Sequence, residues 1–270
     1  MISLHHHAID SANSIAVITF NRPKKLNAWN EPLLDALRSA LRSAASDSSV
    51  SAAVLTGTGR YYSSGYDFGA RMNSAKPTMP SVFLSELSAS NERLFEMFIG
   101  FPKVLVCACN GPAVGAAVTS ALLCDFIVCS DSATFLTPFT SLGITPEGCS
   151  TFTFEDRMGA EGASRVLNGE KISASDAISM GFVDMVVPGN EVLEQSLRIA
   201  RDWVLEKRPK RYAQQVHILR RHNKEESDIL ARSFLQRPFL EKLYNMSSGV
   251  GQKAAFWVAM RIVPWMVPRL

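Results

Sequence analysis

Two glycine-containing segments place backbone N–H groups where a ligand can reach them. In the first, Ser64-Gly65-Tyr66-Asp67, a glycine at a strand-to-loop bend directs the Tyr66 N–H into a cavity. The second, NGPAVGAA over residues 110–117, lets a ligand approach the backbone where a helix begins. Two such donors from separate loops would form an oxyanion hole, in which one good donor lowers a reaction barrier by about 3 kcal/mol.

Glu147 is one of several carboxylates that could transfer a proton. It precedes Gly148 at the expected start of a helix, with Phe139 and Ile144 among its apolar neighbours in the sequence. Apolar surroundings raise the pKa of a carboxyl group toward the working pH, which suits an acid/base. A structural role is also open, because the dipole of the following helix would stabilise a carboxylate at this position.

These segments fall at the ends of expected strands and helices. Residues 14–20 (SIAVITF) are β-branched and aromatic and predict a strand, as does 51–57 (SAAVLTG). Between them, leucines at helical spacing predict a helix from Glu31 to about Ala45, with Asn30 as its N-cap. This order indicates a parallel α/β sheet. Further strands are expected over 103–109, 125–130 and 183–188, and further helices over 81–98, 115–123 and 172–182.

The chain divides into a core and a helical end. Residues 1–190 carry the strand patterns and the motifs, whereas residues 191–270 carry helical patterns only, including a basic amphipathic stretch over 207–224. We expect the second region to act as a lid or an oligomer contact. Residues 57–80 are rich in Gly, Ser, Pro and aromatic residues and predict a long functional loop.

Together the motifs resemble those of the crotonase (enoyl-CoA hydratase/isomerase) superfamily. SSGYDF is similar to its SGxD segment, NGPAVGAA to its second glycine motif, and Cys124-Asp125 to the start of its next strand. PFTSLGITPEGCSTFTFEDRMG is similar to the segment that holds the catalytic glutamate of peroxisomal Δ3,Δ2-enoyl-CoA isomerases. The resemblance implies an α/β fold, the crotonase (ClpP-like) spiral of repeated ββα units, followed by a C-terminal helical region.

The resemblance also implies roles for individual residues. Glu147 becomes the acid/base, and the N–H groups of Tyr66 and Ala116 become the oxyanion hole. Related hydratases need two carboxylates, and the corresponding positions here hold Thr119 and Phe139, which argues against hydration. The implied substrate contacts are Ser64, Gly65 and Gly115 beside the oxyanion hole, and Phe139, Leu142, Ile144 and Phe152 in the acyl pocket.

The reaction implied is isomerisation of 3-enoyl-CoA to trans-2-enoyl-CoA, which feeds unsaturated fatty acids into β-oxidation. Other acyl-CoA activities of the superfamily stay open, namely dienoyl-CoA isomerase, hydratase and thioesterase. A carboxylate opposite Glu147 would favour the dienoyl-CoA isomerase. A non-catalytic RNA-binding or assembly subunit is a further alternative, which a blocked cavity or a continuous basic face would favour.

A fatty acyl-CoA substrate brings phosphates, so cations are expected near the mouth of the site. Arg22, Lys24 and Lys25 follow the first strand and are the candidates, although solvated loop charges explain them equally well. No cofactor is implied, since coenzyme A is part of the substrate. No metal is expected either, because the consecutive His5, His6 and His7 would alternate in direction on an extended surface strand.

Composition restricts the class of protein. The net charge of +3 does not favour a nucleic-acid binder, and the five cysteines form no CxxC pair and are expected to be reduced core residues. No apolar run approaches the length of about 18 residues that predicts a membrane span. Pro268-Arg269-Leu270 is similar to an SKL-type peroxisomal signal, with chance as an equal explanation and a mitochondrial or cytoplasmic location left open. The superfamily resemblance implies a homotrimer or a dimer of trimers.

Overall fold

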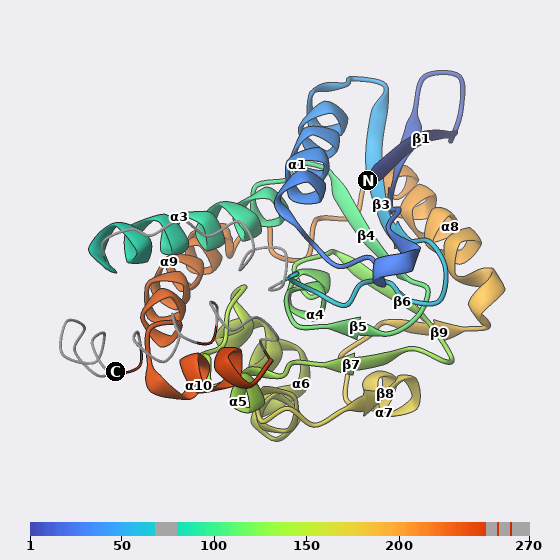
Figure 1. The fold of residues 1–270 in the computed structure, drawn as a ribbon. Coiled ribbons are helices and arrows are strands. Elements are labelled where there is room, and N and C mark those ends of the chain that lie inside the picture. The colour runs from blue at the N-terminus through green and yellow to red at the C-terminus, as the bar shows by residue number, and fades with distance from the viewer. Residues whose placement is uncertain (68–79, 247–252, 254–259, 261–270) are drawn as a thin grey trace.

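The computed structural model describes residues 1–67 and 80–246, together with residues 253 and 260 (Figure 1). Its main element is a six-stranded sheet with the strand order β1-β2-β3-β4-β6-β9. Strand β1 is antiparallel to β2, and all the other neighbouring pairs are parallel. The strands are β1 (Ile2–Ala8), β2 (Ser14–Phe20), β3 (Val50–Gly57), β4 (Val104–Cys109), β6 (Phe126–Ser130) and β9 (Met185–Val187).

Helices cover both faces of this sheet. On one face, α1 (Glu31–Ser46) buries Leu33, Leu37 and Leu41, and on the other α8 (Val192–Leu205) packs on β3 and β4 (Figure 1). Coverage on both faces explains why the central strands are almost continuous runs of apolar residues. The predicted N-cap of α1 is confirmed, because the Asn30 side chain accepts from the Leu33 N–H at 3.2 Å.

The strands of a second, three-stranded sheet were not predicted from the residue patterns. This sheet joins β5 (Ala113–Val114), β7 (Thr134–Leu136) and β8 (Ile172–Ser173), with β5 parallel to β7 and β7 antiparallel to β8. Helix α4 (Ala116–Ala121) follows β5 and packs on it, and α7 (Ala174–Ser179) contacts β7 and β8. The longer α6 is formed by Ser150–Leu167. The small sheet matters because β5 carries one of the two glycine segments.

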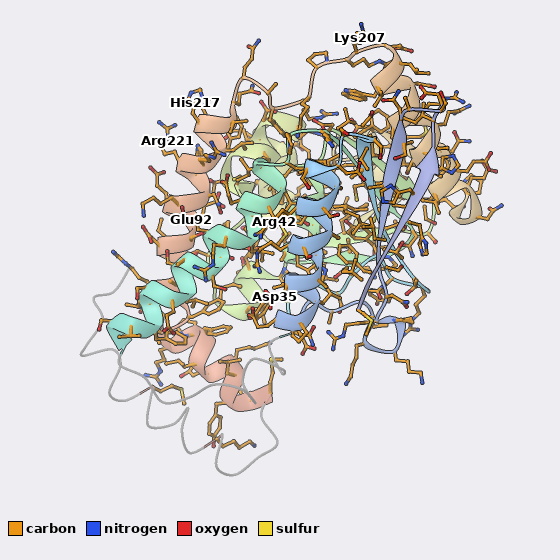
Figure 2. The ribbon with its side chains drawn as sticks, turned by 90° about the horizontal axis from the view of Figure 1, so that it is seen from above. Asp35, Arg42, Glu92, Lys207, His217 and Arg221 are labelled. Carbon is orange, nitrogen blue, oxygen red and sulfur yellow. The ribbon has the colours of Figure 1, made fainter. Side chains whose placement is uncertain are left out.

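A layer of helices stands beside the sheets. In it, α3 (Pro80–Ile99) packs along α9 (Val216–Ser233), and α10 (Arg237–Met246) contacts the short α5 (Phe139–Leu142) (Figure 1). On α9 the polar side chains of His217 and Arg221 point outward (Figure 2), whereas Leu219 and Leu230 are buried. This confirms a docked amphipathic helix.

The structure corrects the expected extent of the basic stretch over 207–224. Helix α8 ends at Leu205 and α9 begins only at Val216. The interruption follows from the left-handed backbone of Lys207 (φ 52°) and from Pro209, which cannot donate a helical hydrogen bond.

Several other predictions about the fold are confirmed. The strands and helices of the main sheet are confirmed at their predicted places, as are the surface strand with His5, His6 and His7 and the buried free cysteines. No helix in the described part of the chain is long and apolar enough to cross a membrane. The division at residue 190 stays a prediction, and most of the expected loop over 57–80 lies outside the described residues.

Candidate active site

The two glycine segments run side by side. The Tyr62 N–H donates to the Pro112 carbonyl at 3.1 Å, and the Val114 N–H donates to the Ser63 carbonyl at 3.0 Å. Gly65 has a positive φ of 78°, and a Cβ atom there would lie 2.4 Å from the Val114 carbonyl oxygen. Only glycine fits so close an approach. The pairing brings the backbone of Tyr66 next to that of Ala116.

Ala116 is the first residue of α4. Gly115 precedes it with a φ of 57° and donates its own N–H to the Leu136 carbonyl at 2.8 Å. N–H groups in the first turn of a helix have no acceptor within that helix, so the Ala116 N–H has no intrahelical partner. Every residue of α4 is buried, as its small side chains permit.

Glu147 is a buried carboxyl group with an exposed fraction of 6%. Its Oε1 atom accepts a hydrogen bond from Thr119 Oγ1 at 3.1 Å. Burial is the main cause that raises its pKa to about 8, because it disfavours the charged form. The Thr119 hydrogen bond acts in the opposite direction, and the charge of Glu226 adds to the rise. The pKa thus lies in the range that suits an acid/base near neutral pH.

A tight turn directs the Glu147 side chain. Gly148 and Cys149, the two residues that follow, both have left-handed backbones, with φ values of 72° and 63°. A Cβ atom at Gly148 would lie 2.6 Å from the Phe95 ring and 2.7 Å from Thr119 Oγ1, so a side chain is excluded there. Because a left-handed backbone is uncommon for a residue other than glycine, the surrounding contacts must hold Cys149 in place.

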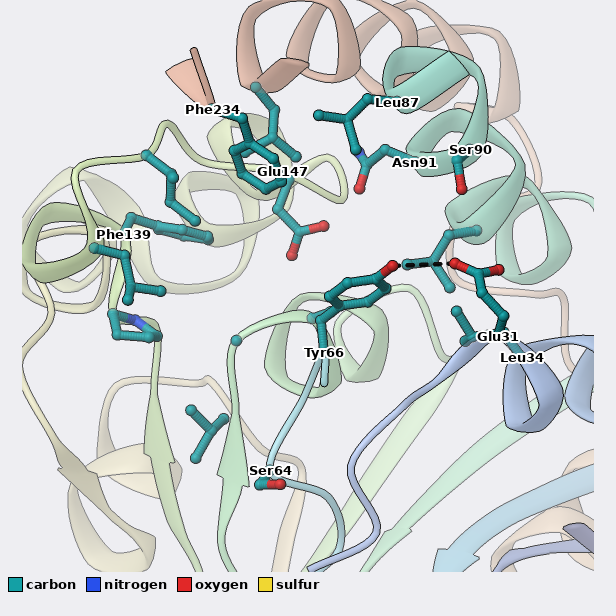
Figure 3. Close-up of a pocket in the computed structure, with 18 of the residues that line it drawn as sticks. Glu31, Leu34, Ser64, Tyr66, Leu87, Ser90, Asn91, Phe139, Glu147 and Phe234 are labelled. Atoms are coloured by element: carbon teal, nitrogen blue, oxygen red, sulfur yellow. Dashed lines mark hydrogen bonds between the residues drawn. The ribbon is translucent and has the colours of Figure 1, made fainter. Parts of the chain in front are cut away.

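These groups line one cavity of about 190 Å³ (Figure 3). The Glu147 carboxylate points into it, toward the side of the Tyr66 ring (Figure 3). Most of the wall is apolar and comes from three places: helix α3, the segment around α5, and the end of α9. The apolar side chains are those of Leu34, Leu87, Leu94, Val114, Pro138, Phe139, Leu142, Ile144, Leu230 and Phe234.

Most of the sequence-predicted site residues meet at this cavity. Its lining includes Ser64, Tyr66, Gly115, Ala116, Phe139, Leu142, Ile144 and Glu147. Gly65 lies between two of them in the chain and sets the contact between the two glycine segments. Their roles toward a substrate stay predictions.

Phe152 requires a correction. It does not line the cavity but packs with Tyr212 and His222, at ring-centroid distances of 6.4 and 5.4 Å. The reason is its place in the first turn of α6, where its side chain faces α9 rather than the cavity.

The three candidate phosphate-binding cations lie outside the cavity. Arg22 forms an ion pair with Asp67 at 3.4 Å and donates to the Ala28 carbonyl. Lys24 and Lys25 are exposed on a short 3₁₀ turn and line a separate shallow hollow with Asn21. Binding of coenzyme A phosphates by these residues remains a prediction.

Sequence reasoning missed a polar part of the cavity wall. The Tyr66 hydroxyl donates to Glu31 Oε1 at 3.0 Å, and Ser90 and Asn91 face the same region from α3 (Figure 3). Arg38 completes this polar part. The apolar spacing that predicts α1 and α3 does not reveal which polar side chains border the cavity. Within the described ranges, no group of three His, Cys, Asp or Glu residues could hold a metal ion.

Comparisons with known proteins agree with this architecture. The family described as enoyl-CoA hydratase/isomerase matches residues 10–246. Enoyl-CoA delta isomerase 2 of Homo sapiens is 34% identical over 259 residues, which cover 89% of this chain and 62% of that protein. Enoyl-CoA delta isomerase 3, peroxisomal, of Mus musculus is 42% identical over 181 residues, which cover 67% of this chain and 56% of that protein. The chain thus spans less than two thirds of these relatives.

A solved structure confirms the expected fold class. The enoyl-CoA hydratase/isomerase of Pseudoalteromonas atlantica superposes with a TM-score of 0.75 at 26% identity and covers 95% of this chain and 96% of its own. The crotonase fold predicted from the motifs is therefore confirmed.

Proposed function

Because the chain belongs to the enoyl-CoA hydratase/isomerase family, we propose that it converts 3-enoyl-CoA to trans-2-enoyl-CoA. The observation that carries the proposal is the buried Glu147, whose carboxyl group faces an apolar cavity beside the two glycine segments. Two similar proteins named enoyl-CoA delta isomerase support the choice of reaction. The product would enter the β-oxidation of unsaturated fatty acids.

The proposed reaction starts with removal of a proton. The thioester carbonyl oxygen accepts from the N–H groups of Tyr66 and Ala116, and the Glu147 carboxylate takes a proton from C2. The electron pair of the broken C–H bond forms an enolate, whose negative charge the two N–H groups stabilise. The enolate then re-forms the carbonyl, the double bond moves from C3–C4 to C2–C3, and Glu147 returns its proton at C4.

A single base suffices in this scheme, and the surroundings of Glu147 suit it. An apolar cavity wall favours the protonated carboxyl group that exists between the two transfers. The positions at which related hydratases carry carboxylates hold Thr119 and Phe139, and here Thr119 donates to Glu147 instead of acting as a second acid. This supports isomerisation over hydration.

The test compares turnover of a 3-enoyl-CoA and a 2-enoyl-CoA by the wild type and by Glu147→Gln. We expect rapid 3-to-2 isomerisation by the wild type and a loss of about 10²–10⁴-fold in the variant, which keeps the shape but lacks the base. Glu155→Gln, at an exposed position on α6, is the matched control and should retain activity. The proposal fails if the wild type does not isomerise, or if Glu147→Gln retains its rate.

A second candidate is an activity that needs two carboxylates, such as a dienoyl-CoA isomerase or a hydratase. Glu31 favours it, because this carboxylate borders the same cavity. In Figure 3, however, the Tyr66 ring lies between Glu31 and Glu147, and Glu31 accepts from the Tyr66 hydroxyl. If Glu31→Gln abolished turnover of a dienoyl-CoA or a 2-enoyl-CoA by an otherwise active wild type, this second function would be preferred.

A non-catalytic subunit is less well supported. One of the two features that would favour it was a blocked cavity, whereas a cavity of about 190 Å³ lies beside Glu147. If the wild type bound an acyl-CoA without converting it, this alternative would replace the isomerase.

We also propose a peroxisomal location, which the name of the mouse relative supports. Residues 268–270 lie outside the described residues. Imaging of the protein with a fluorescent tag at its N-terminus, against peroxisomal and mitochondrial markers, tests this. Overlap with the mitochondrial marker would contradict it.

Assembly as a homotrimer or a dimer of trimers is likewise proposed from family membership. Light scattering should give three or six times the mass of one chain. A mass of one chain at micromolar concentration would contradict it.

A further inference from the structure

Glu226 is a buried carboxyl group that the proposed reaction does not use. It lies on α9, and its exposed fraction is only 5%. Burial raises its pKa, because the charged form loses its hydration, while hydrogen bonds to it act in the opposite direction. Burial of a carboxyl group costs free energy unless the group is paired or hydrogen-bonded. The groups that contact Glu226 therefore indicate its role.

Those contacts are with the start of α6. The Thr151 N–H donates to Glu226 Oε1 at 2.9 Å, and the backbone N–H groups of Cys149 and Ser150 interact with the same carboxyl group. The N-cap residue of this helix, Cys149, makes no side-chain capping hydrogen bond. Glu226 therefore caps this helix from outside, and a negative charge at a helix N-terminus is favourable.

The capped residues lie two to four positions after Glu147 in the chain. Gly148 and Cys149 form the left-handed turn between the acid/base and α6, and the Cys149 thiol donates to the Leu219 carbonyl of α9 at 3.2 Å. Two contacts from one helix thus hold the turn. A shift of α9 would therefore move the Glu147 carboxyl group relative to the cavity.

The two carboxyl groups also interact through charge. The negative charge of Glu226 contributes to the raised pKa of Glu147, and Glu226 Oε2 has no hydrogen-bond partner among the described residues. A carboxylate without full compensation in a poorly hydrated interior acts on nearby charges more strongly than one in water.

Other titratable groups near Glu226 come from three elements. The turn before α6 contributes Glu147 and Cys149, and α9 itself contributes His222, whose Nδ1 lies 3.2 Å from Thr151 Oγ1. On the side of α3, Glu96 is paired with Arg220, and the Glu92 carbonyl accepts from Asn223. The His222 side chain contacts Thr151 as Glu226 does, so the effect of His222 needs a separate control variant.

We propose that Glu226 is a positioning residue for Glu147, which fixes the turn that carries it and acts on it through its charge. The inference rests on the proposed proton transfer by Glu147 and adds a second buried carboxyl group to it. Glu226 itself does not line the cavity and touches no substrate.

Two variants separate the two effects, and two further variants serve as controls. Glu226→Gln keeps an acceptor for the Thr151 N–H but removes the charge, and Glu226→Ala removes both. Glu225→Gln, at the adjacent exposed position of α9, is the matched control, and His222→Gln controls for the neighbouring imidazole.

The charge effect is measured without turnover, by ¹³C NMR titration of the Glu147 carboxyl group in glutamate-labelled protein. We expect Glu226→Gln to lower the titration midpoint of Glu147 by about half a pH unit or more, because a like charge disfavours ionisation. Glu225→Gln and His222→Gln should leave the midpoint within about 0.2 units of the wild type. An unchanged midpoint in Glu226→Gln would overturn the proposal.

The positioning effect is measured as kcat. Glu226→Ala should lower kcat for 3-enoyl-CoA roughly tenfold or more with little change in KM, and Glu226→Gln should recover most of it. A kcat of Glu226→Ala equal to that of the wild type would also overturn the proposal. Absence of any isomerisation by the wild type would contradict the proposed function alone, because the NMR midpoint reports the interaction between the carboxyl groups independently.

Discussion

Thr119 Oγ1 donates a 3.1 Å hydrogen bond to the Glu147 carboxylate, so helix α4 contributes both a proposed backbone donor and a partner for the proposed acid/base. The bond stabilises the charged form of Glu147 and lowers its pKa against the effect of burial. The same hydroxyl also lies 3.3 Å from the Ala116 carbonyl. Thr119 thus connects the two halves of the proposed site.

Replacement of Thr119 by valine should raise the pKa of Glu147, because the shape is kept while the hydrogen bond is lost. The ionised fraction at pH 7 then falls, and kcat/KM for a 3-enoyl-CoA should fall roughly threefold to tenfold. Thr119→Ser, which keeps the hydroxyl, is the control. The measurement is kcat/KM against pH, and superimposable profiles for Thr119→Val and the wild type would count against this role.

The wild-type activity itself should rise with pH. Proton abstraction requires the ionised carboxylate, and the pKa of Glu147 is about 8. We expect kcat/KM for isomerisation to rise about tenfold per pH unit below the pKa and to level off above it. Stopped-flow or steady-state assays between pH 5.5 and 9.5 would check this range, which spans the pKa on both sides. A rate that falls as pH increases would indicate that the protonated carboxyl group reacts.

Glu147 should also make the protein less stable at alkaline pH. Its folded-state pKa of about 8 exceeds the ordinary value of 4.5, so the folded protein binds the proton more tightly. The resulting stabilisation is complete below the unfolded pKa and is lost as pH rises through the folded pKa. Glu147→Gln lacks this loss, so its free energy of unfolding should exceed that of the wild type by on the order of 5 kcal/mol at pH 9.

Urea unfolding at pH 5 and pH 9 measures this difference. Glu155→Gln, with its exposed side chain, should track the wild type at both pH values. If the free energies of unfolding of Glu147→Gln and the wild type differed by the same amount at both pH values, burial of the Glu147 charge would not explain the difference.

Gly65→Ala should damage both stability and activity. The added Cβ atom would lie 2.4 Å from the Val114 carbonyl oxygen, and the φ of 78° is unfavourable for alanine. We expect a loss of about 2–4 kcal/mol in the free energy of unfolding and a large fall in kcat as the glycine segments separate. The matched control is Gly169→Ala, where φ is 83° but the nearest atom lies at 3.4 Å.

Chemical denaturation of the two glycine variants would separate the cost of the left-handed backbone from the cost of the contact with Val114. Gly169→Ala measures the cost of the left-handed backbone alone, about 1 kcal/mol, and should leave kcat unchanged. Equal losses of stability in both variants would show that the contact with Val114 adds nothing.

Whether a strand or helix could be predicted from the sequence depended on the length of its residue pattern. Strands β2, β3 and β4 are runs of six to eight residues with clear apolar character, and they were predicted at their observed places. Strands β5 and β8 contain two residues each, which is too short for any period to be visible. The motifs carried the prediction of Glu147 and of the glycine segments.

Contacts between distant helices were beyond sequence reasoning. Phe152 and Glu226 owe their surroundings to the packing of α6 against α9, some seventy residues apart in the chain. Likewise, the bond between Tyr66 and Glu31 joins a loop to a helix thirty-five residues earlier. Residue types and spacing within one element contain no information on such partners.

Much of the cavity wall and the two glycine segments belong to different parts of the fold. The glycine segments are anchored by the sheets, whereas Leu87, Leu94, Leu230 and Phe234 belong to the helical layer of α3 and α9 and the residue that follows it. Substitutions in that layer would reshape the proposed space for an acyl chain and leave the proposed backbone donors in place. New substrate preferences could therefore evolve by a few replacements in the helices, without rebuilding the chemistry.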